Sequence, residues 1–361
     1  MESPNLLALA VVWYYFRNLI RSFNLRRPQS NEEDLAMISY IIRRFLYAIP
    51  ILIGVNILTF ILFFIINSPD DMARMQLGQK HVTQQAIENW KQQHGYDVPL
   101  LWNAKAPAEE KLTKTIFYQK SVGLFLFRFG TSDSGRNIGA DIKERALPSL
   151  AVALPTLVIG LITDICVALM VVLFRGSKLE LGGMVLCVIL MSVSSLFYII
   201  GGQFVIAKVL RWVPISGYDD GFAAIKFIIL PVLIGVFSGL GSGVRWYRTL
   251  FLEEVEKDYV RTARAKGLTE TQTLFRHVLP NAMIPILTGV VVVLPMLFMG
   301  SLIMESFFSI PGLGSYTIDA INSQDFAIVR AMVFLGSVLY VIGLLLTDIS
   351  YTLVDPRVRL S

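Results

Sequence analysis

Six apolar runs, each long enough to cross a membrane as a helix, constrain this chain more than any other feature. A hydrocarbon layer about 30 Å thick needs roughly 20 apolar residues in helical form. The runs cover residues 45–66, 147–174, 181–207, 227–244, 282–304 and 331–353. Only helices and closed barrels satisfy every backbone group in lipid, and these runs are too long and too apolar for barrel strands. The sequence therefore predicts an all-α membrane protein with six core transmembrane helices.

The overall composition supports a membrane class. Hydrophobic residues make up 54% of the chain and charged residues 16%, with a mean hydropathy of +0.60, which is far more apolar than a soluble domain. Cys166 and Cys187 both fall in apolar runs, so we interpret them as small core residues and expect neither a disulfide nor a zinc site. His81 and His94 lack a further ligand at metal-binding spacing, so no metal site is expected.

The placement of basic residues predicts the topology. Arg43 and Arg44, the turn at 175–178, the segment 245–276 and the C-terminal tail all lie on one side of the six runs. Short loops rich in Lys and Arg remain in the cytoplasm. The opposite loops include 306–326, which contains no Lys or Arg. We therefore expect a multi-pass membrane protein with the N- and C-termini of its core in the cytoplasm.

The chain divides into four parts on this pattern. Residues 37–67 carry the first core helix, 68–146 form a large external (periplasmic) loop subdomain, and 147–361 hold five helices and a cytoplasmic loop at 245–281. Residues 1–36 contain an apolar stretch too short for a confident span. We expect an interfacial or dispensable extension there. A seventh helix and a natural start at Met37 remain the alternatives.

A charged cassette at 258–286 lies between two apolar runs. Its first part favours helix, Gly267 is a natural stop, and Thr269 with Gln272 matches a capping box that begins a second helix. Pro280 lies where the chain enters the next membrane helix. Acidic and basic residues alternate with apolar ones, which suits a groove in a partner protein better than an anionic membrane surface. The apolar members are Val260, Ala263, Leu268 and Leu274.

This cassette resembles the cytoplasmic EAA loop of ABC importer permeases. In that family a Gly is followed after nine residues by a hydrophobic-x-Leu-Pro sequence, and here Gly267 precedes His277-Val278-Leu279-Pro280. The leading Glu-Ala-Ala positions fall on Arg261-Thr262-Ala263, a departure typical of the branch for peptides and nickel, whose members carry RTARAKG at this place. Segments 42–63, 128–155, 305–314 and 348–359 resemble the same branch in the same order.

The resemblance implies a permease subunit of an ATP-driven importer in the bacterial cytoplasmic (inner) membrane, which is not an enzyme. The chain has no GxxxxGK[ST] motif, so it cannot hold nucleotide phosphates in a P-loop. We expect no cofactor on this chain, and ATP and Mg on partner subunits. The implied partners are a second homologous permease, one or two cytoplasmic ABC ATPases, an external solute-binding protein and membrane lipid, with no nucleic acid. Peptides are the expected cargo, with nickel chelates as the alternative.

The resemblance also implies two sets of functional positions. Contact with the ATPase, or the shape needed for it, is expected at Arg261, Thr262, Ala263, Arg264, Gly267, Leu268 and Pro280. The external turn offers two glycines beside a proline, and it either reverses the chain or lines the outer mouth and meets the binding protein. Its residues are Pro311, Gly312 and Gly314.

Two other classes of function, a proton-coupled carrier and an intramembrane protease, fit the sequence less well. A proton-coupled carrier would use intramembrane acids, for which Asp164 and Asp348 are the candidates, but no Lys, Arg or His lies within a run to complete a relay. An intramembrane protease would need a Ser-His pair, paired acids or an HExxH helix. Neither acid has such surroundings, and none of the three His lies in a run.

Overall fold

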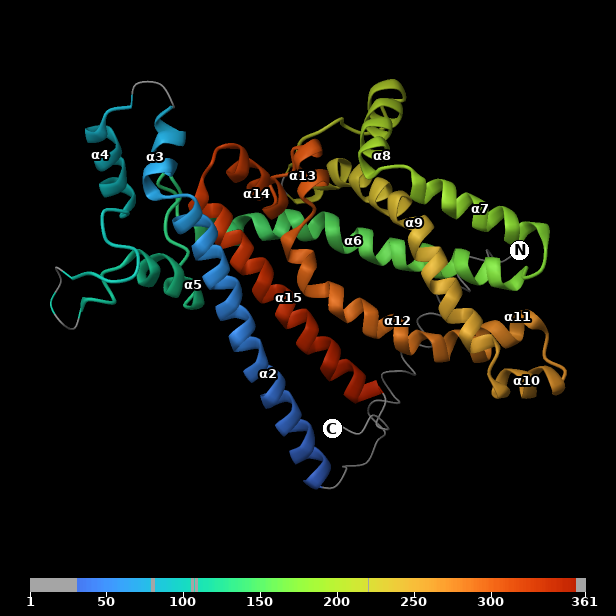
Figure 1. Cartoon of the computed structure of the whole chain (residues 1–361). Coiled ribbons are helices and arrows are strands. Elements are labelled where there is room, and N and C mark those ends of the chain that lie inside the picture. Colours follow the sequence, from blue (N-terminus) through green and yellow to red (C-terminus); the bar gives the residue numbers. More distant parts are fainter. Residues whose placement is uncertain (1–30, 79–81, 105–106, 108–109, 220, 355–361) are drawn as a thin grey trace.

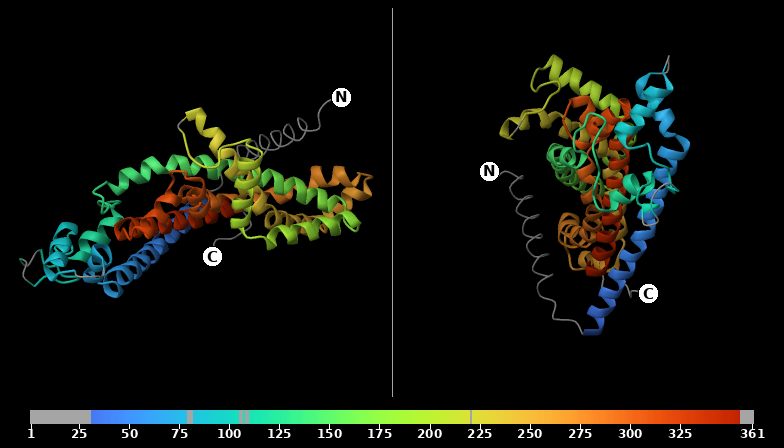
Figure 2. Two further views of the ribbon diagram at one scale, coloured as in Figure 1. Left: turned by 90° about the horizontal axis from the view of Figure 1, so that it is seen from above. Right: turned by 90° about the vertical axis from the view of Figure 1, so that its left-hand side faces the viewer.

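The computed structural model describes residues 31–78, 82–104, 107, 110–219 and 221–354. The molecule is elongated, with α3 and α4 at one end and α10 and α11 at the other (Figures 1 and 2). Within the described ranges the structure is helical, apart from one isolated bridge between Thr131 and Asn137. The expectation of an all-α membrane protein is confirmed.

Helices make up the membrane part and both of its ends. The longer ones are α2 (Asn31–Phe60), α6 (Ile138–Leu173), α7 (Lys178–Ser192), α9 (Ile225–Val255), α12 (Leu279–Val293) and α15 (Phe326–Val354). The shorter α-helices are α3 (Pro69–Leu77), α4 (Gln84–His94), α5 (Gly123–Phe125), α8 (Ser195–Gly202), α10 (Asp258–Ala265), α11 (Glu270–Thr273), α13 (Leu302–Phe308) and α14 (Leu313–Asn322). The π-helical segments are η1 (Ile61–Ile66), η3 (Phe117–Val122), η4 (Gln203–Val209) and η6 (Leu274–Val278), and the 3₁₀ segments are η5 (Gly221–Ala224) and η7 (Leu294–Met299).

Five continuous helical stretches are long and apolar enough to cross a membrane. They are Ile42–Ile66, Ile138–Leu173, Gly221–Val255, Glu270–Met299 and Phe326–Ser350. Each covers most or all of one predicted run, and α2 packs against α15 (Figure 1). Several stretches extend past the apolar run at one end, because the polar residues there also favour helix.

The expectation of one continuous helix for the third run is wrong. The run is divided into Lys178–Ser192 and Ser195–Val209, which are bent by 87°. Ser194 has extended backbone angles, φ −62° and ψ 144°, and the three serines around the break form no strong helix. The hydroxyl of Tyr198 donates to the backbone oxygen of Leu190 over 2.9 Å. This bond satisfies a carbonyl that the interrupted helix leaves open.

The fifth run also ends earlier than expected. Its helical stretch stops at Met299, and Gly300 has a φ of +66°. A side chain at Gly300 would collide with the carboxylate of Glu305. Met304, the predicted end of the run, therefore lies in the separate short helix α13.

The segment between the first two spans packs on the membrane helices. Met72, Ile87 and Trp90 share a buried cluster with Phe60 and Phe64, which lie near the C-terminal end of the first span. The loop that is predicted to be external is thus anchored on that span. The proposals for residues 1–36 and for His81 fall mostly or wholly outside the described residues, although α2 already begins at Asn31.

Candidate functional site

The cassette forms the helix, Gly turn and second helix that its sequence predicts. Helix α10 ends at Ala265, and Gly267 has a φ of +85°, a left-handed conformation that favours Gly. The Thr269 side chain accepts from the backbone N–H of Gln272, and the Gln272 side chain accepts from that of Thr269. The second helix continues without a break through η6 into α12, with Pro280 in its first turn.

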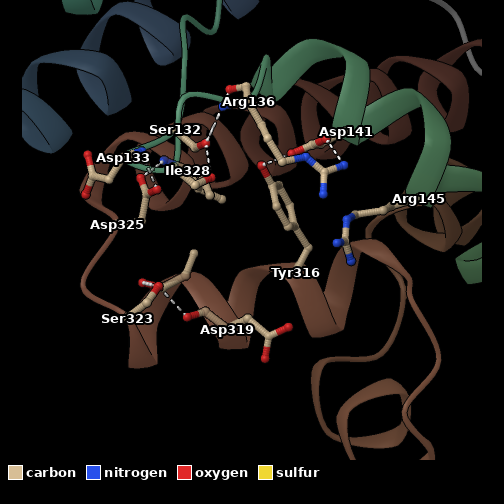
Figure 3. A pocket seen from close by; sticks show the side chains of 12 residues that line it. Ser132, Asp133, Arg136, Asp141, Arg145, Tyr316, Asp319, Ser323, Asp325 and Ile328 are labelled. Carbon is tan, nitrogen blue, oxygen red and sulfur yellow. Dashed lines mark hydrogen bonds and ion pairs between the residues drawn. The ribbon is translucent and has the colours of Figure 1, made fainter. Parts of the chain in front are cut away.

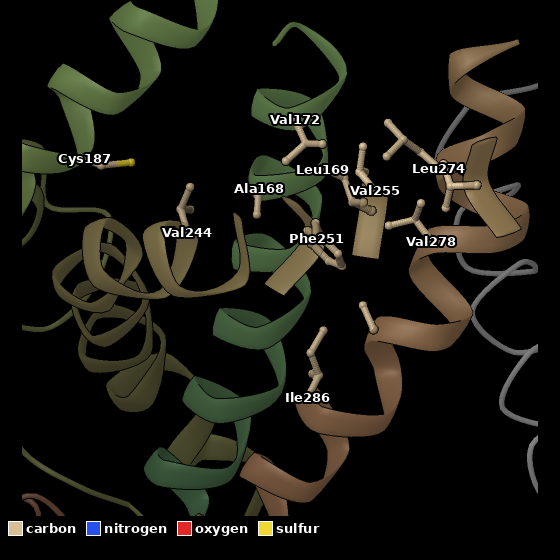
Figure 4. Packing of buried hydrophobic residues seen from close by; sticks show 12 residues of the cluster. Ala168, Leu169, Val172, Cys187, Val244, Phe251, Val255, Leu274, Val278 and Ile286 are labelled. Atoms are coloured by element: carbon tan, nitrogen blue, oxygen red, sulfur yellow. The ribbon is translucent and has the colours of Figure 1, made fainter. Parts of the chain in front are cut away.

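The inner face of the cassette belongs to the hydrophobic core of the membrane part. Val260 and Val278 are fully buried, and Ala263 and Leu274 nearly so. Val260, Leu274 and Val278 share a cluster with residues of α6, α9 and α12, including Phe251 (Figure 4). The expectation that Val260, Ala263 and Leu274 present an apolar surface to a partner is therefore wrong. These side chains attach the cassette to its own membrane helices, and only Leu268 of that set is part-exposed.

A buried carboxylate fixes the entry to α10. Glu254 is 8% exposed, and it accepts hydrogen bonds from the ammonium of Lys257 and the hydroxyl of Tyr259. Burial, and then the bond to Glu254, raise the pKa of Tyr259 well above its usual value. The phenol therefore stays protonated and acts as a donor. The sequence reasoning did not predict this cluster, although it noted the acids that follow the fourth run, Glu253, Glu254 and Glu256.

Ion pairs connect the cassette to itself and to the neighbouring turn. The Arg264 Nε lies 2.8 Å from Glu270 Oε1, and its Nη2 donates to Oε2 over 3.0 Å, so this pair bridges the Gly267 turn. Arg175, in the turn between α6 and α7, lies 3.6 Å from Glu256. The Arg264–Glu270 pair therefore holds the two helices of the cassette together, and the Arg175–Glu256 pair holds the cassette to the turn between α6 and α7.

The outer face of α10 is polar and open. Arg261, Thr262 and Arg264 are exposed, as is Gly267. Arg261 makes one long ion pair, 3.6 Å to Asp258, in which both side chains are largely in solvent. Such pairs contribute little to stability. The face therefore offers the exposed guanidinium of Arg261 on a short helix at one end of the molecule.

The predicted external turn is tightly packed. Pro311 is exposed, whereas Gly312 and Gly314 are buried. Neither glycine has a positive φ, and a side chain at Gly314 would lie 2.7 Å from the backbone of Ser301. The two glycines allow close approach of backbone and of the buried Glu305, whose carboxylate accepts from the N–H groups of Gly314 and Ser315 over 2.7 and 3.1 Å.

A polar pocket of about 290 Å³ lies beside this turn (Figure 3). Asp141, at the start of α6, accepts from Arg136 over 2.6 Å and from the hydroxyl of Tyr316 over 3.1 Å. The guanidinium of Arg145 stacks 4.7 Å from the Tyr316 ring. These contacts fix α14 against α6 on the predicted external side, a long-range arrangement that the sequence reasoning did not anticipate.

The two acids considered for proton transport have different surroundings. Asp348 forms a 3.2 Å ion pair with Arg44 of α2, so it ties the last span to the first. Asp164 lies against Gly243 of α9, and its Oδ1 atom has no hydrogen-bond partner among the described residues. Asp164 is carried by α6 and Asp348 by α15.

Comparisons with known proteins agree with this architecture. Residues 165–360, which include the cassette, match the family described as binding-protein-dependent transport system inner membrane component, and residues 37–106 match the N-terminal component of such proteins. An oligopeptide transport system permease of Bacillus subtilis is 29% identical over 90% of this chain and 100% of its own length. A putative peptide transport system permease of Brucella abortus is 30% identical over 90% of this chain and 99% of its own.

A third relative has a differently named cargo. A glutathione transport system permease of Salmonella choleraesuis is 29% identical over 90% of this chain and 99% of its own length. The family match spans more than half of the chain, and the relatives are covered almost completely. The chain belongs to the family of inner membrane components of binding-protein-dependent transport systems, the permeases of ABC importers.

Proposed function

We propose that the outer face of α10 is the docking element for a separate cytoplasmic ATPase. The observation that carries this proposal is the asymmetry of the cassette, whose apolar side is buried in the core while its polar side is open. Arg261, Thr262 and Arg264 would contact the ATPase. Ala263, Gly267, Leu268 and Pro280 would set the shape and position of the helix.

Movement of α10 would reach the membrane spans through direct packing. Val260 and Leu274 lie in one buried cluster with residues of α6, α9 and α12. Because a packed core transmits displacement rather than absorbing it, a push on α10 would tilt these spans together. ATP and Mg would act on the partner ATPases, so this chain would supply the mechanical link.

We further propose that a cavity of about 540 Å³ is this chain's part of the transport pathway. It lies among α6, α8, α9 and η7, where the third and fifth runs are both interrupted. Irregular backbone at membrane depth is tolerated where it is buried in protein or lines a water-filled space. The lining of the cavity is mostly apolar, and its small polar side chains are Ser149, Thr156, Ser195, Ser238 and Ser301.

Peptides are the proposed cargo, because two of the relatives are named for peptides and a third for glutathione, itself a peptide. One such chain would form half of the pathway with a second homologous permease, more readily a different chain than a copy. An external solute-binding protein would deliver the cargo on the side of α14, and the core termini would lie in the cytoplasm.

Capture of the full-length chain from its native membrane tests the coupling proposal. In mild detergent we expect a P-loop ATPase and a second six-run permease to be recovered with it. The ATPase should be lost when Arg261 and Thr262 are both changed to Glu, while the second permease should remain. Recovery of the chain alone, with transport driven by a proton gradient, would refute the proposal.

Uptake measurements test the cargo. Cells lacking this chain should lose accumulation of labelled di- and oligopeptides and regain it when the chain is restored. If peptide uptake is unchanged while chelated nickel uptake is lost, the peptide assignment is wrong although the importer assignment stands.

A further inference from the structure

A cationic cavity lies at the outer end of the last span, away from the cassette and the proposed pathway. It has a volume of about 270 Å³, and its wall contains Lys120, Arg128 and Arg330 together with Leu124 and Ala327. No Asp or Glu is among the described residues that line it. Three cations around one small space repel one another unless an anion lies between them.

Arg330 is the unusual member of this group. It is 5% exposed, one turn inside the span that begins at Phe326. Its Nε donates to the backbone oxygen of Phe326, and its Nη2 makes a long 3.4 Å bond to the hydroxyl of Tyr96. Its guanidinium also lies over the Phe64 ring, 4.5 Å from the ring centre, but the buried Nη1 has no hydrogen-bond partner among the described residues. A buried guanidinium with an open donor is costly unless something accepts from it.

The nearest acids are engaged elsewhere. Asp133 accepts from Gln76 and lies 3.3 Å from His94, and Asp325 accepts from the N–H groups of Asp133 and Ile328. Neither acid forms an ion pair with Arg330, and none of the three cavity cations has an ion-pair partner among the described residues. The positive charge of the cavity is therefore balanced only at a distance.

Lys120 is a second cation of the cavity without an ion-pair partner among the described residues. Its ammonium donates to the backbone oxygen of His94 over 2.9 Å and lies 5.1 Å from the centre of the Tyr96 ring. Burial, and then the nearby Arg330 guanidinium, lower the pKa of Lys120, although Asp133 opposes the shift. An anion in the cavity would relieve this repulsion.

The segment that carries Lys120 and Arg128 lies alongside the spans. The backbone oxygen of Ser121 accepts from Asn56 of α2 over 3.1 Å, and the rings of Phe125 and Phe334 are 5.3 Å apart, edge to face. Phe334 lies about two helical turns inside α15. The segment 117–128 therefore reaches down beside the membrane helices and does not stand free above them.

Exposed apolar side chains then follow at the tip of this segment. Phe125, Leu126 and Phe127 are 37%, 65% and 57% exposed, and Arg128 comes directly after them. An apolar tip next to basic residues is the pattern of a surface that enters the headgroup region of a bilayer. We propose that the cavity binds the phosphate of an anionic phospholipid headgroup, with the acyl chains beside Phe125, Leu126 and Phe127.

Lipid titration by native mass spectrometry of the full-length chain in mild detergent tests the proposal. Dioleoyl phosphatidylglycerol should bind, while dioleoyl phosphatidylcholine should bind more weakly and inorganic phosphate should not compete at equal concentration. Because each cation near a charged surface contributes about fivefold in affinity, Arg128→Gln should weaken phosphatidylglycerol binding by roughly that factor. Lys143→Gln removes another exposed cation outside the cavity and should leave binding unchanged.

Three results would overturn the assignment. Equal phosphatidylglycerol affinity of wild type and Arg128→Gln would exclude the cavity as the site. Competition by inorganic phosphate at equal concentration would mean that the cavity takes a free oxyanion without its acyl chains. Loss of lipid binding only when the partner permease is present would mean that an acidic side chain of that partner fills the cavity. Arg330→Gln should abolish binding, but because that variant also removes a buried group, Arg128→Gln is the deciding variant.

Discussion

Replacing Gly267 changes the backbone conformation of the cassette without changing its charges, so it tests whether the shape of the turn matters for docking. Its φ of +85° lies in the left-handed region, and apart from its chain neighbours no described residue has an atom within 4 Å of the place where a Cβ would stand. The cost of a side chain is therefore confined to the backbone. Ala in this conformation costs about 1 kcal/mol and a β-branched residue about 2 kcal/mol, whereas Asn tolerates it far better.

If docking needs the left-handed turn, these free-energy costs lower the affinity of the chain for the ATPase by the corresponding factors. Gly267→Asn should stay near wild type, Gly267→Ala should weaken capture about fivefold, and Gly267→Val about thirtyfold. The assay is titration of the purified ATPase onto the full-length chain in detergent, with the bound fraction measured at each concentration. Only the order Asn, Ala, Val agrees with a backbone cause.

Gly135 provides the matched control on the predicted external side. Its φ is +79°, and it too has no atom within 4 Å of the place where a Cβ would stand. Gly135→Val should carry a similar backbone cost but leave ATPase capture intact. Equal loss of capture in Gly135→Val and Gly267→Val would refute the argument, since the effect would then be general destabilisation.

Three further changes test other parts of the structure. Arg264→Glu should weaken ATPase capture, and adding Glu270→Arg should not restore it, because Arg264 is proposed to contact the ATPase. Full recovery of capture in the double variant would mean that the pair only braces the turn. Gly314→Ala should lower stability by about 1–3 kcal/mol through overpacking against backbone, seen in thermal unfolding, while Gly289→Ala, where nothing lies within 4 Å, should not. Asp164→Asn should leave uptake intact, even when a protonophore is added and ATP is held constant, because an ATP-driven importer needs no proton at that site. Loss of uptake in this variant would support the proton-coupled carrier instead.

The local features of the cassette were predictable because neighbouring residues determine them. Gly267 supplies a conformation that other residues adopt at a cost, and the Thr269 and Gln272 side chains cap a helix three residues apart. The turn residue and the capping box each depend only on residues that are close together in sequence. For the same reason the membrane spans followed from apolar runs, since lipid imposes the same requirement on every spanning segment.

Features that depend on distant segments were not predictable. Val260 and Leu274 were assigned to an open face, yet both are buried in one cluster with residues of α6, which is far away in sequence. The break in the third run at Ser194 was likewise invisible to an apolar count, because Ser is uncharged and the run keeps its hydropathy through the break. One sequence contains no direct sign of which side chains meet across such distances.

The last prediction concerns what makes the cassette rigid. Its exposed ion pairs contribute at most about 1 kcal/mol each, whereas a fully buried Leu contributes about 1.5–3 kcal/mol. Leu274→Ala should therefore uncouple ATP hydrolysis from uptake more severely than Arg264→Glu does. Ile286→Ala is the control, because Ile286 belongs to the same cluster and is equally buried, but it lies inside the span. Both variants should lose about 2–5 kcal/mol of stability. If they also lower the ratio of uptake to ATP hydrolysis equally, coupling does not pass through the contact between η6 and α10.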